Sequence, residues 1–109
     1  MLQKQYRLPA ATRLRNSLSF TSPFFSLRIS NNNLEYNRYG FLVKKAVDKR
    51  ATVRNRIRRL FRSCIEEMLG EIKAGQDMLF ILNNKIVEMK REDLYNEVHS
   101  FFEEKHLLQ

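Results

Sequence analysis

The stretch "KRATVRNRIRRLFR", from Lys49 to Arg62, combines dense positive charge with a regular apolar spacing. Two basic residues open it, and five arginines follow from Arg54 onward with no acidic residue among them. The apolar side chains recur at helical spacing, at Val53, Ile57, Leu60, Phe61, Cys64, Ile65, Met68, Leu69 and Ile72. This pattern predicts a long amphipathic helix that begins near Val53, is capped by Thr52 and stops near Gly75.

The arginines form one face of the predicted helix. On a helical wheel, Asn55, Arg59 and Arg62 point nearly opposite to the apolar side chains, and Arg56 and Arg58 flank them. Like charges three or four residues apart cost ~0.2–0.5 kcal/mol per pair in an isolated helix, and cations in the first turn oppose the helix dipole. A sequence that accepts these costs indicates a function, and the planar guanidinium fork matches phosphate oxygens.

Charge is also divided unequally along the chain of 109 residues, whose net charge is +8. Residues 1–62 hold 15 Lys and Arg against 2 acidic residues, whereas residues 63–109 hold 5 against 10. A basic half joined to an acidic half favours a surface that binds a polyanion. The alternative is a solvated arginine surface that is partly paired with the acidic half.

The remaining segments predict an α+β fold in a single small domain, 1–109, with an α-β-β-β-α-β-α order and about four strands. In "FFSLRIS", Phe25, Leu27 and Ile29 alternate with Ser26 and Arg28, which is typical of a strand with one packed face. Asparagines then supply a turn. The other predicted elements are a short helix at 9–18, one or two strands at 37–47, a strand buried on both faces at 77–83 and a helix at 91–105.

No catalytic or metal-binding constellation is evident in the protein. Cys64 lies on the apolar stripe and is interpreted as a core residue. His99 and His106 are seven residues apart, far from the basic stretch, and are interpreted as surface residues. No apolar run is long enough to span a membrane, and the N-terminus lacks the apolar region of a signal peptide. We therefore expect an intracellular protein without a bound metal or cofactor.

The segment "VKKAVDKRATVRNRIRRLFR" resembles the signature of the bacterial ribonuclease P protein component. Arg54, Asn55 and Arg56 match the Arg-Asn-Arg core of that signature. The N-terminal "MLQKQYRL" resembles the family's opening. Three further arginines match the basic positions that follow the core, namely Arg58, Arg59 and Arg62.

The resemblance implies a protein subunit of ribonuclease P, in which the RNA subunit, with Mg²⁺, removes the 5′ leader of precursor tRNA. It implies no catalytic residue in the protein and no activity of the protein alone. It further implies a cytoplasmic protein that is monomeric outside the ribonucleoprotein and has ribonuclease P RNA and precursor tRNA as partners. The residues expected to bind RNA are Lys45, Lys49, Arg50, Arg54, Asn55, Arg56, Arg58, Arg59 and Arg62.

The resemblance also implies a cleft for the single-stranded leader between the first helix and the sheet. In this chain the cleft maps to Leu14, Leu18, Ser26 and Arg28. The family commonly carries aromatic residues at three of these positions, where this chain has two leucines and an arginine. Finally, the family implies that the crossover from the strand before the basic helix to the strand after it is left-handed, although such crossovers are right-handed in about 98% of cases.

Three other classes of protein are the alternatives. Another structural RNA-binding protein, such as a ribosomal protein, has a similar composition, and only the matched motif separates the two. A protein-only nuclease requires clustered carboxylates or histidines for metal ions, and a helix-turn-helix protein requires a short helix before the basic one. Neither feature is found, since strands are predicted before the basic helix.

Overall fold

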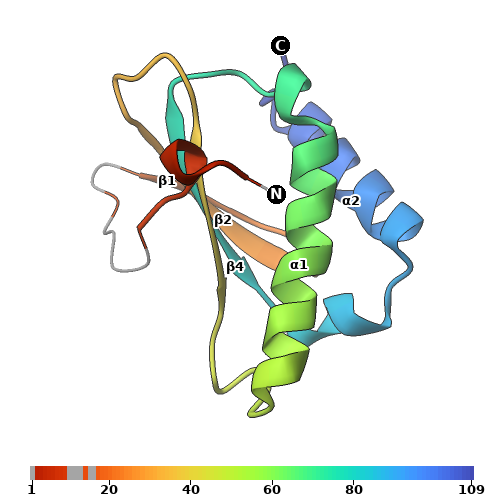
Figure 1. Ribbon diagram of the computed structural model, residues 1–109. Helices are drawn as coiled ribbons and strands as arrows, with labels where there is room; N and C mark the ends of the chain where they lie inside the picture. Colours follow the sequence, from red (N-terminus) through yellow and green to blue (C-terminus); the bar gives the residue numbers. More distant parts are fainter. Residues whose placement is uncertain (1, 10–13, 15–16) are drawn as a thin grey trace.

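The computed structural model describes residues 2–9, 14 and 17–109, and these form one mixed sheet with two α-helices on one of its faces (Figure 1). Three 3₁₀ helices connect the larger elements: η1 (Lys4–Tyr6), η2 (Leu69–Glu71) and η3 (Asn84–Glu88). This arrangement confirms the predicted α+β class. The strands and α-helices are β1 (Leu18–Thr21), β2 (Phe25–Asn31), β3 (Arg38–Val43), α1 (Ala51–Glu67), β4 (Gln76–Leu82) and α2 (Arg91–Glu104).

The strands lie side by side in the order β1-β2-β4-β3. β1 pairs with β2 and β2 with β4 in antiparallel fashion, whereas β3 and β4 are parallel. β4 is central, with its core face fully covered by helices and its other face half-buried, so the prediction of a strand buried on both faces is close to the structure.

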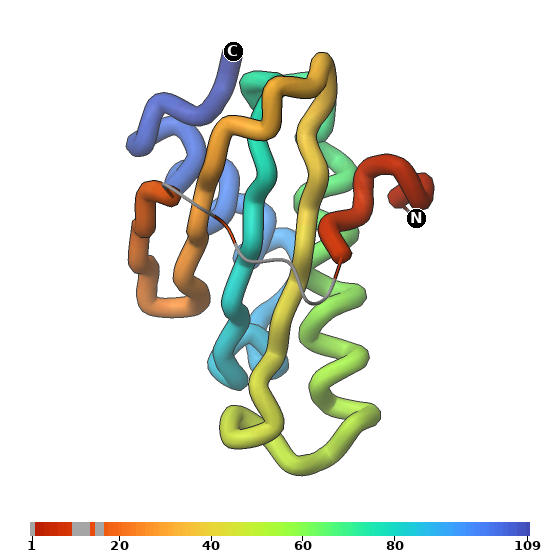
Figure 2. The backbone as a smooth tube through the Cα atoms, turned by 90° about the vertical axis from the view of Figure 1, so that its left-hand side faces the viewer, coloured from red at the N-terminus to blue at the C-terminus, as the bar shows by residue number. Residues whose placement is uncertain are grey.

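The β3–α1–β4 crossover is left-handed, as the resemblance implied. In Figure 2 the helices lie behind the sheet, both strands run down the page, and β4 lies to the left of β3. A right-handed crossover would place β4 to the right in this view. For this strand order, the handedness determines which face of the sheet α1 covers, and the direction of β3 places the basic N-terminal half of α1 at the end of the sheet where β3 stops.

Aromatic rings form the centre of the core between the sheet and the helices. Phe80 of β4 is fully buried and lies among four other rings. It stacks on Phe41 and Phe102 with interplanar angles of 9° in both cases. Its ring centroid is 5.0 Å from that of Phe61, which anchors α1 to β4. α1 and α2 therefore pack against one shared aromatic layer.

The bounds of α1 differ from the prediction at both ends. The helix begins at Ala51 with Arg50 as its N-cap, and no side chain caps it, so the expectation that Thr52 is the cap is wrong. The backbone carbonyl of Arg50 instead accepts the amides of both Val53 and Arg54 at 3.1 Å. The α-helix ends at Glu67, and η2 then carries the apolar pattern onward.

Gly75 forms the turn into β4 and does not end α1. Its φ angle of 89° is in the left-handed region, which favours glycine. A side chain here would bring a Cβ atom within 3.3 Å of the Leu34 carbonyl oxygen, so the two connections are packed against each other. Asn33, at φ 58°, makes the predicted asparagine turn after β2.

The short helix expected at 9–18 is not found in the described part of that range. Residues 10–13 and 15–16 lie outside the described residues. Pro9, Leu14 and Ser17 are not helical, and Leu18 begins β1, where it pairs with Ile29. The four-residue spacing of Leu14 and Leu18 suggested a shared helical face, whereas the hairpin with β2 places Leu18 in an extended strand.

Before β1, the chain packs on the outer edge of the sheet. The Leu8 amide donates to the carbonyl of Tyr39 at 2.8 Å, and Arg7 forms a parallel bridge with Tyr39. The Leu8 side chain is buried against Gly40 of β3. The segment therefore covers part of the free edge of β3, which protects it from pairing with other chains.

Replacing Gly40 with valine should displace this N-terminal segment. A Cβ atom at position 40 would lie 3.1 Å from Leu79 Cδ1 and 3.3 Å from Leu8 Cβ, so Leu8 must move. We expect hydrogen exchange of the Leu8 amide to accelerate at least tenfold in the variant, because its bond to Tyr39 is lost. Gly70→Ala is the control, since a Cβ atom there meets nothing within 4 Å. Unchanged protection of Leu8 in Gly40→Val would contradict the proposed contact.

Candidate nucleic-acid interface

One side of α1 packs in the core and the opposite side is exposed. Val53, Ile57 and Phe61 are buried against the sheet. Asn55, Arg56 and Arg59 are exposed, and the predicted division between an apolar and a basic side is therefore found for these residues. The exposed side begins at the N-terminus of α1, where the helix dipole adds to the positive potential.

Arg62 does not lie on the fully exposed side that the helical wheel predicted. Its side chain is half-buried, and its guanidinium carbon lies 5.8 Å from the centroid of the Phe41 ring. The long arginine side chain reaches toward β3 and places its guanidinium group over the face of the Phe41 ring. The guanidinium group therefore lies beside the sheet, at one border of the basic side.

Arg58 is also partly enclosed. Its Nη2 atom donates to Asn55 Oδ1, and this contact links the two side chains along one turn of α1. Burial lowers the pKa of Arg58 from its ordinary value, and the positive charges of Arg54 and Arg62 lower it further. The residue remains charged at neutral pH, so this crowding means that the basic side is electrostatically strained in the absence of an anion.

Arg54 shapes the loop that precedes α1. Its Nη1 atom donates to the backbone carbonyls of Asp48 and Lys49, at 2.8 and 2.9 Å. The carboxylate of Asp48 accepts two hydrogen bonds from the Arg50 guanidinium and one from the Arg50 amide. These contacts hold the loop in one conformation and partly neutralise Arg50, an internal role that the sequence did not suggest.

The Asp48 carboxyl should titrate at unusually low pH. The Arg50 side chain, followed by the Arg50 amide, lowers the pKa of Asp48 from 3.8 to about 2. Because the folded pKa is lower than the unfolded one, the stabilisation is complete above pH 3.8 and is lost as the pH falls through about 2. Carbon-13 NMR of the carboxyl should give a midpoint near 2, and Arg50→Leu should return it toward 3.8. A midpoint that Arg50→Leu leaves unchanged would rule out this pairing in solution.

Besides Lys44, which directly follows β3, four basic side chains in this region have no hydrogen-bond or ion-pair partner within the part of the chain that the structure describes. They are all exposed and come from the loop before α1 and from its first three turns. Their charges are therefore available to an external anion. These residues are Lys45, Lys49, Arg56 and Arg59.

The open face of the sheet provides a second polar surface. Ser26 and Arg28 of β2 point away from the helices, since Leu27 and Ile29 on the alternate positions are buried in the core. Leu18 is paired with Ile29 and therefore lies on the opposite, helix-covered side of the sheet. The expectation that Leu18 shares one cleft with Ser26 and Arg28 is wrong for this reason. Leu14 is half-buried.

Two side chains of β4 belong to the open face and were missed. Leu79 pairs directly with Arg28, and Ile81 pairs with Ser26. Both are half-buried, and they give the open face an apolar floor between its polar groups. The sequence "DMLFILN" does not reveal which side chains face the open side of the sheet, because apolar residues occupy both faces of the strand.

Over residues 2–9, 14 and 17–109 no group of three or more His, Cys, Asp or Glu side chains could hold a metal ion. Cys64 is buried, and burial raises the pKa of its thiol. His99 Nε2 lies 3.3 Å from Glu71 Oε1, away from the basic side. None of the helices in the described ranges combines the length and apolar character needed to cross a bilayer.

Together, a mixed sheet with a left-handed crossover and a helix whose exposed cations have no ion-pair partner among the described residues are typical of an α+β RNA-binding protein. The sequence pattern of the family described as "Ribonuclease P" matches residues 4–106. A ribonuclease P protein component from Thermoanaerobacter sp. (strain X514) is 38% identical over 81 residues, which cover 74% of this chain and 69% of the relative. One from Marinomonas sp. (strain MWYL1) is 31% identical over 103 residues, with coverages of 84% and 77%.

The chain belongs to the ribonuclease P protein family, whose members are subunits of the ribonuclease P endoribonuclease and partners of its RNA. Solved structures agree with this fold. The ribonuclease P protein of Staphylococcus aureus has a TM-score of 0.76 at 19% identity and covers 95% of this chain and 98% of its own. That of Thermotoga maritima has a TM-score of 0.71 at 22% identity, with coverages of 79% and 81%.

Proposed function

We propose that the basic side of α1 and the loop before it form the surface that binds ribonuclease P RNA. The observation that carries this proposal is the group of exposed cations without internal partners at the N-terminal half of α1. Arg56 and Arg59 are the most accessible guanidinium groups on this helix. Arg54 acts differently, since its hydrogen bonds to the loop carbonyls order Lys49 and Arg50 for contact with the RNA backbone. Asn55 and Arg58 contribute a linked pair of side chains.

We further propose that the open face of the sheet binds the 5′ leader of precursor tRNA. Arg28 is exposed on β2 and supplies a charge for a leader phosphate or a planar group that stacks on a base. Ser26 supplies a hydrogen-bonding group, and Leu79 and Ile81 supply the apolar floor. The lack of an aromatic side chain at position 28 favours weak, sequence-tolerant contact with the leader.

In this proposal the protein performs no bond cleavage. The RNA subunit, with Mg²⁺, hydrolyses the phosphodiester bond, and the protein increases affinity for the RNA and for the precursor. The two surfaces lie on different elements, α1 and β2, so one protein can contact both RNAs at once. We propose that the free protein is a monomer that acts in the cytoplasm.

A reconstitution experiment separates the two surfaces. The protein is added to a bacterial ribonuclease P RNA, and 5′ cleavage is measured on precursor tRNAs with leaders of one and of ten nucleotides. Arg28→Ala should weaken binding of the long-leader precursor several-fold and leave the short-leader precursor and the affinity for the RNA subunit unchanged. Lys90→Ala, which removes one positive charge at an exposed position beside the start of α2, away from the open face, is the control. Equal losses for both leaders would exclude the open face, and cleavage by the protein without any RNA subunit would refute the division of labour.

A further inference from the structure

A cavity of about 320 Å³ lies at the end of the molecule remote from the N-terminus of α1. It is lined by Tyr6 of η1, by residues 35–37 before β3, by η2 and the turn after it, and by Gln109. Three of the four tyrosines line it, namely Tyr6, Tyr36 and Tyr39. Its size is within the range of small-molecule sites, ~300–1,000 Å³.

The tyrosine rings form two walls at nearly a right angle. The planes of Tyr6 and Tyr36 meet at 82°, and their centroids are 5.4 Å apart. Tyr39 is held in place by Asn37, whose Nδ2 atom donates to the Tyr39 hydroxyl at 3.0 Å and to the Lys73 carbonyl at 2.8 Å. The Asn37 Oδ1 atom accepts from the Gln76 amide at 2.7 Å. The cavity is therefore preformed.

The charge of the cavity is opposite to that of the protein. Glu35 is the one charged residue among its described lining residues, and no lysine or arginine lines it, in a chain of net charge +8. The adjacent Arg38 is already bound by Asp77, with the closest atoms 2.7 Å apart. A carboxylate beside aromatic faces repels phosphate and attracts a cation. This site is therefore unsuited to the RNA backbone.

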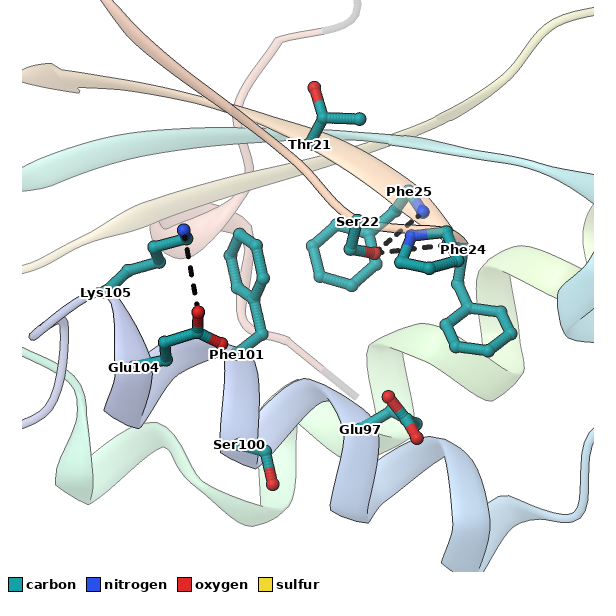
Figure 3. Close-up of a pocket in the computed structure, with 10 residues that line it drawn as sticks. Thr21, Ser22, Phe24, Phe25, Glu97, Ser100, Phe101, Glu104 and Lys105 are labelled. Atoms are coloured by element: carbon teal, nitrogen blue, oxygen red, sulfur yellow. Dashed lines mark hydrogen bonds and ion pairs between the residues drawn. The ribbon is translucent and has the colours of Figure 1, made fainter.

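In a second cavity, a carboxylate and an aromatic ring of the chain already contact a cation of the same chain. This hollow of about 190 Å³ lies between α2 and the turn from β1 to β2. In Figure 3 the Lys105 ammonium at this hollow points toward Glu104. Lys105 Nζ lies 4.0 Å from Glu104 Oε1 and 5.8 Å from the centroid of the Phe20 ring. There, carboxylate and aromatic ring already hold an internal cation. The tyrosine cavity offers a carboxylate and rings without one among its described lining residues.

We infer that the tyrosine cavity binds the ammonium or guanidinium group of an organic cation. The head group lies over the faces of Tyr6 and Tyr36, and Glu35 balances its charge. The group could be carried by a free polyamine or by the side chain of another protein, and both present the same chemistry to the site. Binding here is independent of the RNA-binding side of α1.

Titration of the full-length protein with spermidine and with Nα-acetyl-lysine amide tests this inference. Carbon-13 NMR of the tyrosine rings should show saturable shifts for Tyr6 and Tyr36 and none for Tyr95, which lies on α2 outside the cavity. Saturation by spermidine alone identifies a free polycation, and equal saturation by the lysine derivative identifies a protein side chain. Equal shifts with 1-butanol, which is uncharged, would overturn the inference.

Substitutions distinguish the contribution of the Glu35 charge to binding from that of the tyrosine rings. Glu35→Gln should weaken binding about fivefold, the usual effect of an exposed ion pair, whereas Glu88→Gln, which removes the same charge elsewhere on the surface, should have no effect. Tyr36→Leu should weaken binding by a similar factor, and Tyr36→Phe, which keeps the ring, should retain it. Unchanged affinity in both Glu35→Gln and Tyr36→Leu would refute the site.

Discussion

Replacing Arg56 and Arg59 together with glutamate should lower the affinity for ribonuclease P RNA by about 10²–10⁴-fold. A hydrogen bond between an ionised pair contributes ~1.5–3 kcal/mol, so the loss of two corresponds to this range. The dependence of log affinity on log salt should also become shallower by ~1.4–1.8, because two phosphate contacts are lost. Filter binding over a series of salt concentrations measures both quantities.

The fold should survive this double replacement. Both side chains are exposed and have no partner in the described part of the chain, and the change removes like-charge repulsion near the start of α1. Lys73→Glu with Lys90→Glu is the matched control, since it changes the net charge equally at two other exposed positions. If the control weakens binding as much as the α1 variant, the effect is one of overall charge and the proposed interface is wrong.

Replacing Phe80 with alanine should reduce the free energy of unfolding by ~3–5 kcal/mol, the usual cost of truncating a buried phenylalanine. Phe80 has no exposed surface and stacks between Phe41 and Phe102, with centroids at 5.6 and 6.1 Å. The cavity cannot close easily, because the four rings around it belong to four different elements, β2, β3, α1 and α2. The loss is a large part of the ~5–15 kcal/mol that is typical of whole domains.

Urea denaturation followed by circular dichroism measures this loss. Phe80→Leu, which keeps most of the apolar volume, should cost clearly less than alanine. Leu42→Ala, at a side chain that is 41% exposed, should change the unfolding free energy by less than ~0.5 kcal/mol. A cost below ~1 kcal/mol for Phe80→Ala would mean that the aromatic layer is not the main support of α1.

Helices and strands whose apolar residues recur at a regular spacing could be predicted from the sequence. The alternation of Phe25, Leu27 and Ile29 predicted β2 and its buried face, and the structure buries all three. The pattern after Arg91 predicted α2 within one residue of its end. Such patterns are reliable because burial of one face dominates the local energy.

The errors occurred where a distant partner decided the local structure. Thr52 has a good capping side chain, worth ~1 kcal/mol, but the bonds from Arg54 to the loop carbonyls place the cap at Arg50. Leu18 fits a helix by its spacing from Leu14 and is placed in a strand by pairing with Ile29. The position of Arg62 could not be predicted from a helical wheel, because the wheel does not include Phe41 of β3, over whose ring the Arg62 guanidinium lies.

The interface could be predicted as a set of charges but not as a set of roles. From the sequence, Arg50, Arg54 and Arg59 have the same predicted role, because all three are basic residues of one motif. In the structure the Arg50 guanidinium donates to the Asp48 carboxylate, and Arg54 donates to backbone carbonyls of the loop. The Arg59 side chain has no hydrogen-bond or ion-pair partner within the described ranges. Only the folded loop distinguishes a side chain that organises the surface from one that is available to RNA.

The position of β4 has a consequence for synthesis on the ribosome. β2 and β3 are each hydrogen-bonded to β4 and not to each other, and β4 follows α1 in the chain. A nascent chain that has not yet reached Gln76 therefore lacks the strand that joins its two halves, although every arginine of α1 has already been translated. Until then, the four-stranded sheet on which α1 packs cannot be completed. The order of translation thus makes the charges of the proposed RNA interface available before the fold that positions them.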